Sequence, residues 1–316
     1  MDHSGHGMTM DLPPFTLGRG FAWSADPFFL VACLLGLALY GWGVVRLVRR
    51  GDKWPVGRTV SFMAGVLSVA LMMCTKLNDY GMVMFSVHMV QHMVISMVSP
   101  ILLLLGAPIT LALRALPPAG RGRKGPREVL LMLLHSRYMR IITHPAFTIP
   151  LFIASLYALY FTPLFDTLMG SQAGHIAMMV HFLAVGVVFF WPIMGVDPGP
   201  HRPGYLMRML ELFAGMPFHA FFGIALMMAS SPMVKTFENP PASLGIDALS
   251  DQNAAGGIAW AFSEVPSVLV LLALLFQWYA SEERQARRSD RAADRDGDKE
   301  LAAYNAYLAS LNTRGG

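Results

Sequence analysis

The chain has 316 residues, of which 54% are hydrophobic and only 14% are charged, with a formal net charge of +4 at pH 7. Soluble domains average roughly 25% charged residues, so this composition excludes an ordinary soluble protein. With a mean hydropathy of +0.48, the chain is expected to reside in a lipid bilayer, and no nucleic-acid partner is expected.

Seven apolar runs follow one another along the chain, and each is close to the roughly 20 residues that cross a bilayer as a helix. The predicted spans are Pro27–Val48, Thr59–Leu77, Val83–Leu105, Phe147–Phe165, Gly174–Met194, Leu210–Ala229 and Gly256–Tyr279. This pattern predicts an all-α, polytopic membrane bundle of about seven transmembrane helices over residues 27–279. A segment containing His and Met precedes it at 1–26, and a charged tail follows at 280–316.

The basic residues predict the orientation of the bundle. Lys and Arg gather after the first, third and fifth spans and in the tail, whereas the other side carries only Arg19, Lys76 and Lys235. Basic connections stay in the cytoplasm. The sequence therefore predicts an outer N-terminus and a cytoplasmic C-terminus.

Before the first span, MDHSGHGMTM contains His3, His6 and Met8, which are a weak candidate for a secondary metal site on the outer face. A chance tract of His and Met is the alternative, since the argument rests on composition alone. Cys33 and Cys74 lie singly in apolar runs. Either they pack between helices as small hydrophobic residues, or they form a ligand or redox pair near the outer face.

The third span carries HMVQHM, in which His88 and His92 are four residues apart and therefore share one helix face. Met84 extends that face by one turn. Polar groups inside a bilayer are costly and usually functional. The pair is a candidate for two metal ligands, and the alternative is two histidines that hydrogen-bond to neighbouring helices.

The fifth span carries GHIAMMVHF, in which His175 lies at the outer end and His181 about two turns deeper. Met179 follows His175 by four residues. These histidines are expected to join the third-span pair, either in one broad site or in two stacked sites. Imidazole and thioether ligands together favour copper among the common metals.

The sixth and seventh spans add further candidates. His219 follows Pro217 near mid-depth, and it either serves as a deep ligand or bonds a carbonyl that the proline leaves free. Asp251 precedes the seventh span, and Glu264 lies two to three turns inside it. Each carboxylate is a candidate partner of a histidine, cation ligand or proton acceptor, or makes a structural bond to a neighbouring helix.

At HMVQHM, WPIMGVDP, MPFHAFFG and DQNAAGGIAWAFSE together, the chain resembles the multi-span CtaG-type assembly factors for cytochrome c oxidase first associated with Gram-positive bacteria. The resemblance covers Trp23 to Tyr279. It implies a multi-pass protein of the bacterial inner (plasma) membrane that helps to mature a haem–copper oxidase. The residues that match the family pattern are His88, His92, His175, His181 and His219, with Asp251 and Glu264 as acidic companions.

The leading hypothesis is a non-enzymatic assembly factor that binds copper(I) in the outer half of the membrane and aids its delivery to haem–copper oxidase subunits. Copper chaperones at the outer face are possible donors. Methionine thioethers favour copper(I) over zinc by their softness. The alternatives are a haem-binding electron carrier, a proton-coupled metal transporter, a membrane metalloenzyme and a scaffold without metal.

Overall fold

The computed structural model describes residues 12–120, 123–201, 203–296 and 299–314. The chain divides into two compact units, Met1–Val268 and Leu269–Gly316. The predicted metal segment with His3, His6 and Met8 lies outside the described residues.

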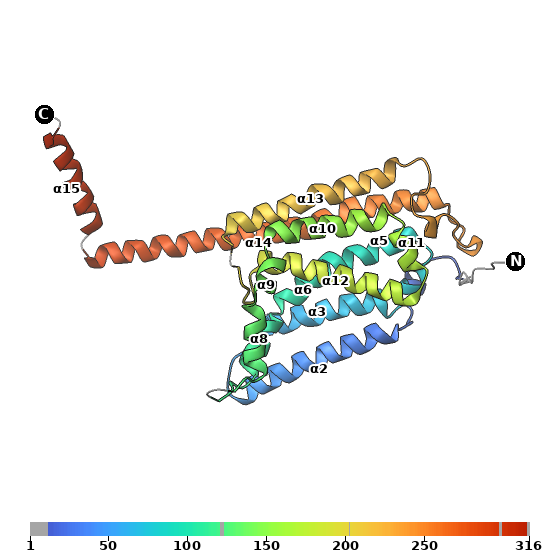
Figure 1. Ribbon diagram of the computed structural model, residues 1–316, viewed down its shortest axis with the longest axis horizontal. Helices are drawn as coiled ribbons and strands as arrows, with labels where there is room; N and C mark the ends of the chain where they lie inside the picture. The colour runs from blue at the N-terminus through green and yellow to red at the C-terminus, as the bar shows by residue number, and fades with distance from the viewer. Residues whose placement is uncertain (1–11, 121–122, 202, 297–298, 315–316) are drawn as a thin grey trace. The chain divides into compact units, whose positions relative to one another are not determined.

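The first unit is a bundle of α-helices (Figure 1). In chain order the helices are α1 (Leu17–Gly20), α2 (Pro27–Arg49), α3 (Val56–Met73), α4 (Leu77–Gly81), α5 (Phe85–Met93), a π-helical turn (Val94–Val98), α6 (Ser99–Leu105), α7 (Pro108–Ala115), α8 (Pro126–Leu134), α9 (Arg137–Ile142), α10 (Pro145–Tyr160), α11 (Leu164–Met169), α12 (Gln172–Met194) and α13 (Tyr205–Met228). Two 3₁₀ turns, Lys235–Phe237 and Ala242–Leu244, lead into α14 (Ala248–Asp296), whose first part belongs to this unit.

The predicted polytopic all-α class is confirmed. Six helices of the described chain are long and apolar enough to cross a membrane, and α10 is a shorter apolar helix. With 16 residues, α10 extends about 24 Å at 1.5 Å per residue, less than the roughly 30 Å of a hydrocarbon core. The predicted fourth span continued to Phe165, but the helix ends at Tyr160 and α11 begins at Leu164.

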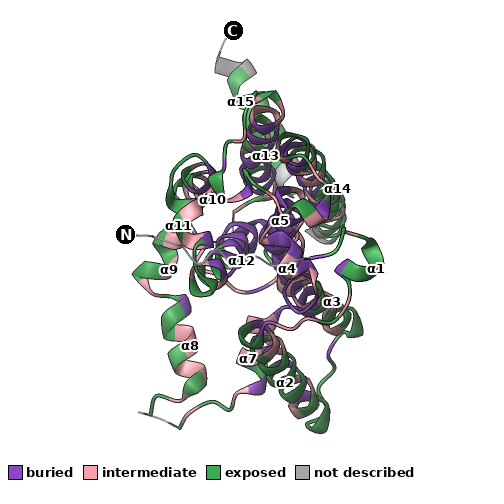
Figure 2. Ribbon diagram, turned by 90° about the vertical axis from the view of Figure 1, so that its right-hand side faces the viewer, coloured by how far each residue is buried: buried purple, intermediate pink, exposed green. Residues whose placement is uncertain are grey.

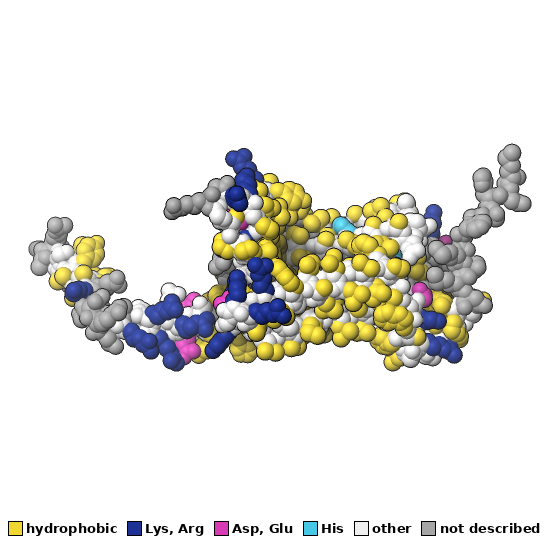
Figure 3. Space-filling view, turned by 90° about the horizontal axis from the view of Figure 1, so that it is seen from below, with side chains coloured by type: hydrophobic (Ala, Val, Ile, Leu, Met, Phe, Trp, Pro, Cys, Tyr) yellow, Lys and Arg dark blue, Asp and Glu magenta, His cyan; other side chains and the backbone are white. Residues whose placement is uncertain are grey.

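Burial divides the bundle into a central and a peripheral part. α12 contacts α6, α10, α11 and α13, and Figure 2 shows buried residues gathered along α5 and α12, whereas α2 is largely exposed. Hydrophobic side chains cover the flank of the bundle, and Lys and Arg gather towards its ends (Figure 3). The exposed residues of α2, such as Val31, Leu34 and Leu39, suit contact with lipid chains.

The third span is interrupted by a π-helical turn because of Pro100. Proline has no N–H and its ring displaces the carbonyl four residues earlier, which here is that of Ser96. Val94–Val98 accordingly adopt the π form. The Ser96 carbonyl faces α12 so closely that a Cβ on Gly186 would lie 2.2 Å from it, so only glycine permits this approach.

The span breaks again before Pro108, where Ala107 has a left-handed φ of 51°. α7 then turns back towards α2. Its first turn is capped by Asp197 from the connection between α12 and α13. The carboxylate accepts hydrogen bonds from the backbone N–H groups of Ile109 (3.1 Å) and Thr110 (2.7 Å).

The second unit consists of the rest of α14, from Leu269, and α15 (Lys299–Arg314). Its α14 segment changes from apolar to charged residues near residue 280. An ion pair four residues apart, Arg287 to Glu283 at 2.6 Å, supports the exposed part of this helix.

Candidate metal centre

α5 begins under a cap supplied by a distant helix. The Asp251 carboxylate on α14 accepts hydrogen bonds from the backbone N–H of Phe85 (2.6 Å) and of Ser86 (3.2 Å), and from the Ser86 hydroxyl. A carboxylate at a helix N-terminus satisfies free N–H groups and is favoured by the helix dipole. Asp251 was predicted as a candidate ligand or companion of the histidines. The structure shows it fixing the start of the helix that carries two of them.

His88 and His175 form the first pair of histidines in the core of the bundle. Both are buried, with 0% and 2% of their surfaces exposed, and their ring centroids are 6.3 Å apart. Nε2 of His88 lies 3.1 Å from the Tyr160 hydroxyl, whereas Nε2 of His175 has no hydrogen-bond partner among the described residues. Nδ1 of His88 also has no hydrogen-bond partner among the described residues, so each ring of the pair keeps one unpaired buried nitrogen.

His92 and His219 form the second pair. Their ring centroids are also 6.3 Å apart, at an interplanar angle of 25°, and the edge of the His92 ring packs against Phe182 at 4.1 Å. Neither ring nitrogen of His92 has a hydrogen-bond partner among the described residues, although the side chain is only 3% exposed. His92 and His219 both line a cavity of about 10 Å³, together with Ser96, Phe182 and four other residues, roughly the space of one water or ion.

Tyr160 connects the two pairs. Its ring lies 6.1 Å from that of His88 and 5.7 Å from that of His92, measured between centroids. It comes from the last turn of α10 and is 3% exposed. The sequence analysis did not single it out, although a phenol at the end of an apolar run was a visible signal.

The methionines near these histidines in the sequence are buried in the same core. Met84 is 7% exposed and Met179 is 0% exposed. Met89, Met93, Met97 and Met178, which also lie close to the histidines in the sequence, are buried as well. The helices α5 and α12 and the π-helical turn between α5 and α6 thus carry buried thioethers as well as the histidines.

His181 and Glu264, two further predicted site residues, are exposed on the outside of the bundle. His181 bonds to the Ser155 hydroxyl and lines an apolar groove of about 360 Å³ between α10 and α12. Six residues turn a helix by about 600°, or about 240° beyond one full turn. His181 therefore points well away from the buried His175.

The described residues hold no group of three or more His, Cys, Asp or Glu side chains close enough to share a metal ion. The histidines instead meet two at a time. Cys33 and Cys74 are free thiols, and Sγ of Cys33 lies 3.9 Å from the carbonyl of Val66.

Three buried polar residues were missed by the sequence analysis. Gln91 donates from Nε2 to the carbonyl of Met72 (2.8 Å). Glu211 is 1% exposed and accepts a hydrogen bond from the Thr148 hydroxyl at 2.7 Å. The Asp26 carboxylate, 6% exposed, caps α2 and accepts from Nε2 of Gln172 at 3.2 Å. A polar residue inside an apolar run was the available signal for Gln91 and Glu211.

The fold and the two pairs define a polytopic membrane protein with imidazoles enclosed in its core. The sequence model of the family described as "Cytochrome c oxidase caa3 assembly factor (Caa3_CtaG)" matches residues 38–281. The chain belongs to this family, and it is a multi-pass protein of the bacterial plasma membrane.

Uncharacterized proteins of three mycobacteria are also similar to this chain. Those of Mycobacterium bovis and Mycobacterium tuberculosis are 46% identical to it over 312 residues, and that of Mycobacterium leprae is 45% identical. The match covers 97% of this chain but 47% of each relative, so the chain spans about half the length of the curated relatives it matches. No solved structure matches the chain.

Proposed function

We propose that this protein binds copper(I) at its two buried histidine pairs and passes it to a haem–copper oxidase during assembly. The observation that carries the proposal is the state of the ring nitrogens. Both nitrogens of His92 and Nε2 of His175 are buried without a hydrogen-bond partner among the described residues. Each buried polar atom left unpaired costs about 1–3 kcal/mol, and a bound ion would offset that cost.

The spacing of the rings supports an ion between them. When two imidazoles bind the same ion, each at a metal–nitrogen distance of about 2.0 Å, their ring centroids lie on the order of 6 Å apart. In both histidine pairs the distance between the ring centroids is 6.3 Å. Zinc sites usually take four ligands. Pairs of imidazoles among buried methionines suit copper(I), which accepts soft thioether ligands.

The arrangement along α5 supports transfer rather than storage. His88 and His92 belong to different pairs and lie about 6 Å apart along the helix axis, one turn from each other. An ion can therefore exchange from the first pair to the second by a short step. A site with two imidazoles also leaves coordination positions open for ligands of a partner.

The small size of the cavity beside the second pair favours an ion rather than a haem as the ligand. A cavity of about 10 Å³ accommodates a single ion but no porphyrin. The family description supports the oxidase as the recipient, since these proteins assemble cytochrome c oxidase.

The test is an anaerobic copper(I) competition titration of the purified protein. The variant His88→Ala with His92→Ala removes one imidazole from each pair. The matched control is His181→Ala, which removes an exposed imidazole from α12. We expect the parent and the control to bind copper(I) tightly and the double variant to lose this binding.

Oxidase activity in membranes of a strain carrying each variant provides the second readout. Gel filtration in detergent checks folding, and asparagine at both positions replaces alanine if the first variant aggregates. Undiminished copper binding by a folded double variant would overturn the proposed site. Lost copper binding with full oxidase activity would instead favour a scaffold without metal.

A further inference from the structure

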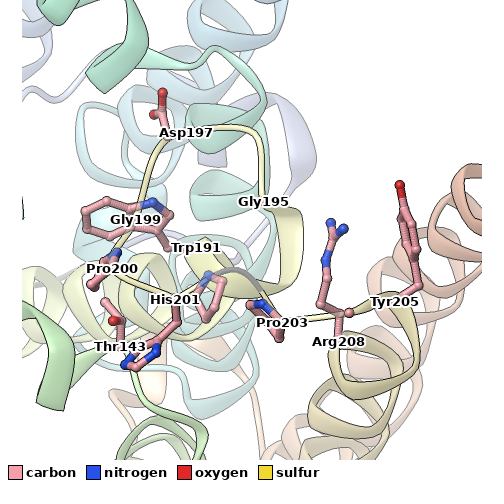
Figure 4. Close-up of a pocket in the computed structure, with 12 residues that line it drawn as sticks. Thr143, Trp191, Gly195, Asp197, Gly199, Pro200, His201, Pro203, Tyr205 and Arg208 are labelled. Carbon is pink, nitrogen blue, oxygen red and sulfur yellow. The ribbon is translucent and has the colours of Figure 1, made fainter. Parts of the chain in front are cut away.

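A second polar cavity lies between two spans, at the other end of α12 from His175. It has a volume of about 280 Å³ and is lined by described residues of the connection between the two spans, among them Gly195, Asp197, Gly199 and His201, together with Trp191, Tyr205 and Arg208 (Figure 4). This connection joins α12 to α13 on the side that carries the predicted cytoplasmic loops. None of these residues belongs to the histidine pairs.

Arg208 forms the cationic wall of the cavity. It is 8% exposed, and it donates from Nε to the carbonyl of Ile193 (2.5 Å) and from Nη2 to that of Met194 (2.6 Å). These bonds place the guanidinium at the C-terminus of α12, where the helix dipole favours a positive charge. An arginine has five N–H donors, and these two hydrogen bonds use two of them.

Gly195 allows the guanidinium to sit there. Its φ is +58°, and a Cβ at this position would lie 3.2 Å from the Arg208 guanidinium. Glycine adopts this left-handed conformation without a steric penalty. The turn at the end of α12 is thereby shaped around the arginine side chain.

Trp191 supplies a second donor without an acceptor. The residue is 8% exposed, and its indole Nε1 has no hydrogen-bond partner among the described residues, although it lines the cavity. A Cβ on Gly199 would lie 3.6 Å from this nitrogen. Indole nitrogen is a donor only, so the ligand that satisfies it must provide an acceptor.

The acidic residue of the cavity is already engaged elsewhere. Asp197 accepts from the backbone of Ile109 and Thr110 and from the Thr110 hydroxyl (2.6 Å), and Figure 4 shows its carboxylate directed away from Trp191. His201 is fixed by the bond from Nε2 to the carbonyl of Arg140 at 2.8 Å. The groups left to meet a ligand are therefore mainly donors, which suits an anion.

We propose that this cavity binds a phosphate group, and that an anionic phospholipid headgroup supplies it. Basic pockets between membrane helices on the cytoplasmic side bind anionic headgroups, and Trp191 and Tyr205 at the ends of two spans are aromatic residues of the kind that lie at headgroup level. One water needs roughly 10–15 Å³ of cavity volume, so a cavity of about 280 Å³ holds a group much larger than a water molecule. Soluble phosphate offers the same chemistry.

The test is native mass spectrometry of the full chain released from nanodiscs that contain equal amounts of phosphatidylglycerol and phosphatidylcholine. Trp191→Phe removes the N–H and keeps a ring, and Gly199→Ala adds a methyl group beside it at ordinary contact distance. The matched control is Trp42→Phe, an exposed tryptophan of α2. We expect the parent and the control to retain phosphatidylglycerol, and both cavity variants to retain it roughly tenfold less.

A parallel titration uses inorganic phosphate on protein freed of lipid, with isothermal titration calorimetry as the readout. Binding of inorganic phosphate that Trp191→Phe weakens, without selective retention of lipid, would support the phosphate site and assign it to a soluble source. The proposal is overturned if phosphatidylcholine is retained equally, or if the cavity variants, shown to be folded by gel filtration, retain phosphatidylglycerol as the parent does.

Discussion

Replacing Asp251 by alanine removes the cap of α5, and we expect this to be among the more destabilising single changes in the bundle. Two backbone N–H groups and the Ser86 hydroxyl lose their acceptor in a site that is 9% exposed. An N-cap is worth about 0.5–2 kcal/mol, and a hydrogen bond to a charged group about 1.5–3 kcal/mol. Because these terms overlap, the expected loss in free energy of unfolding is about 2–4 kcal/mol.

Reversible unfolding in mixed micelles with increasing denaturing detergent measures this loss. The matched control is Asp247→Ala, which removes an exposed carboxylate that bonds the backbone N–H of Ser250 at 2.9 Å, and its effect should be smaller. Copper(I) affinity should also fall in Asp251→Ala, since the cap sets the position of His88 and His92. A stability and a copper affinity equal to those of the parent would refute the role assigned to Asp251.

Two further predictions concern the packing and the pH response of the chain. Gly186→Ala should lower the free energy of unfolding by about 1–3 kcal/mol or more, because the new Cβ would lie 2.2 Å from the Ser96 carbonyl oxygen. The control is Gly41→Ala, whose Cβ would meet nothing within 4 Å and which should not lower the free energy of unfolding. The same unfolding assay compares the two variants. The pKa of Glu128 is held below its ordinary 4.5, chiefly by the hydrogen bond from the Ala119 backbone. Because folding lowers the pKa of Glu128, the hydrogen bonds to its carboxylate stabilise the fold above pH 4.5, and this stabilisation is lost as the pH falls through the folded-state pKa. The protection of the Ala119 amide, expressed as its exchange rate relative to that of an unprotected amide at the same pH, should therefore fall below pH 4.5, and unchanged protection there would contradict the prediction.

Hydropathy and spacing were sufficient for the spans and for the face of α5. Length and apolar content identify a membrane helix without knowledge of its neighbours, and a four-residue spacing places His88 and His92 on one face whatever packs against it. Pro100 marks a point in the third span where proline cannot continue a regular helix. The form of the disruption, a π-helical turn seated on Gly186, depends on a helix about 90 residues later in the chain.

Two features could not be predicted from the sequence: the rotation of each helix about its own axis, and the contacts between residues that are far apart in the chain. Depth along a span follows from counting residues, but the direction of a side chain depends on how the helix is rotated within the bundle. Glu264 and His181 have polar side chains at membrane depth and yet are exposed, whereas Tyr160 is buried between the pairs. The role of Asp251 likewise depends on the proximity of the starts of α5 and α14.

The two pairs depend on a short rigid segment rather than on the whole third span. Asp251 fixes its start, and the π-helical turn begins two residues after His92, where the Ser96 hydroxyl donates to the His92 carbonyl at 2.7 Å. A π-helical turn adds one residue and so rotates everything beyond it by about 100° relative to a regular helix. Residues beyond Val98 therefore leave the face shared by His88 and His92. The bulge thus confines the imidazole face to the roughly two and a half turns between the cap and the π-helical turn.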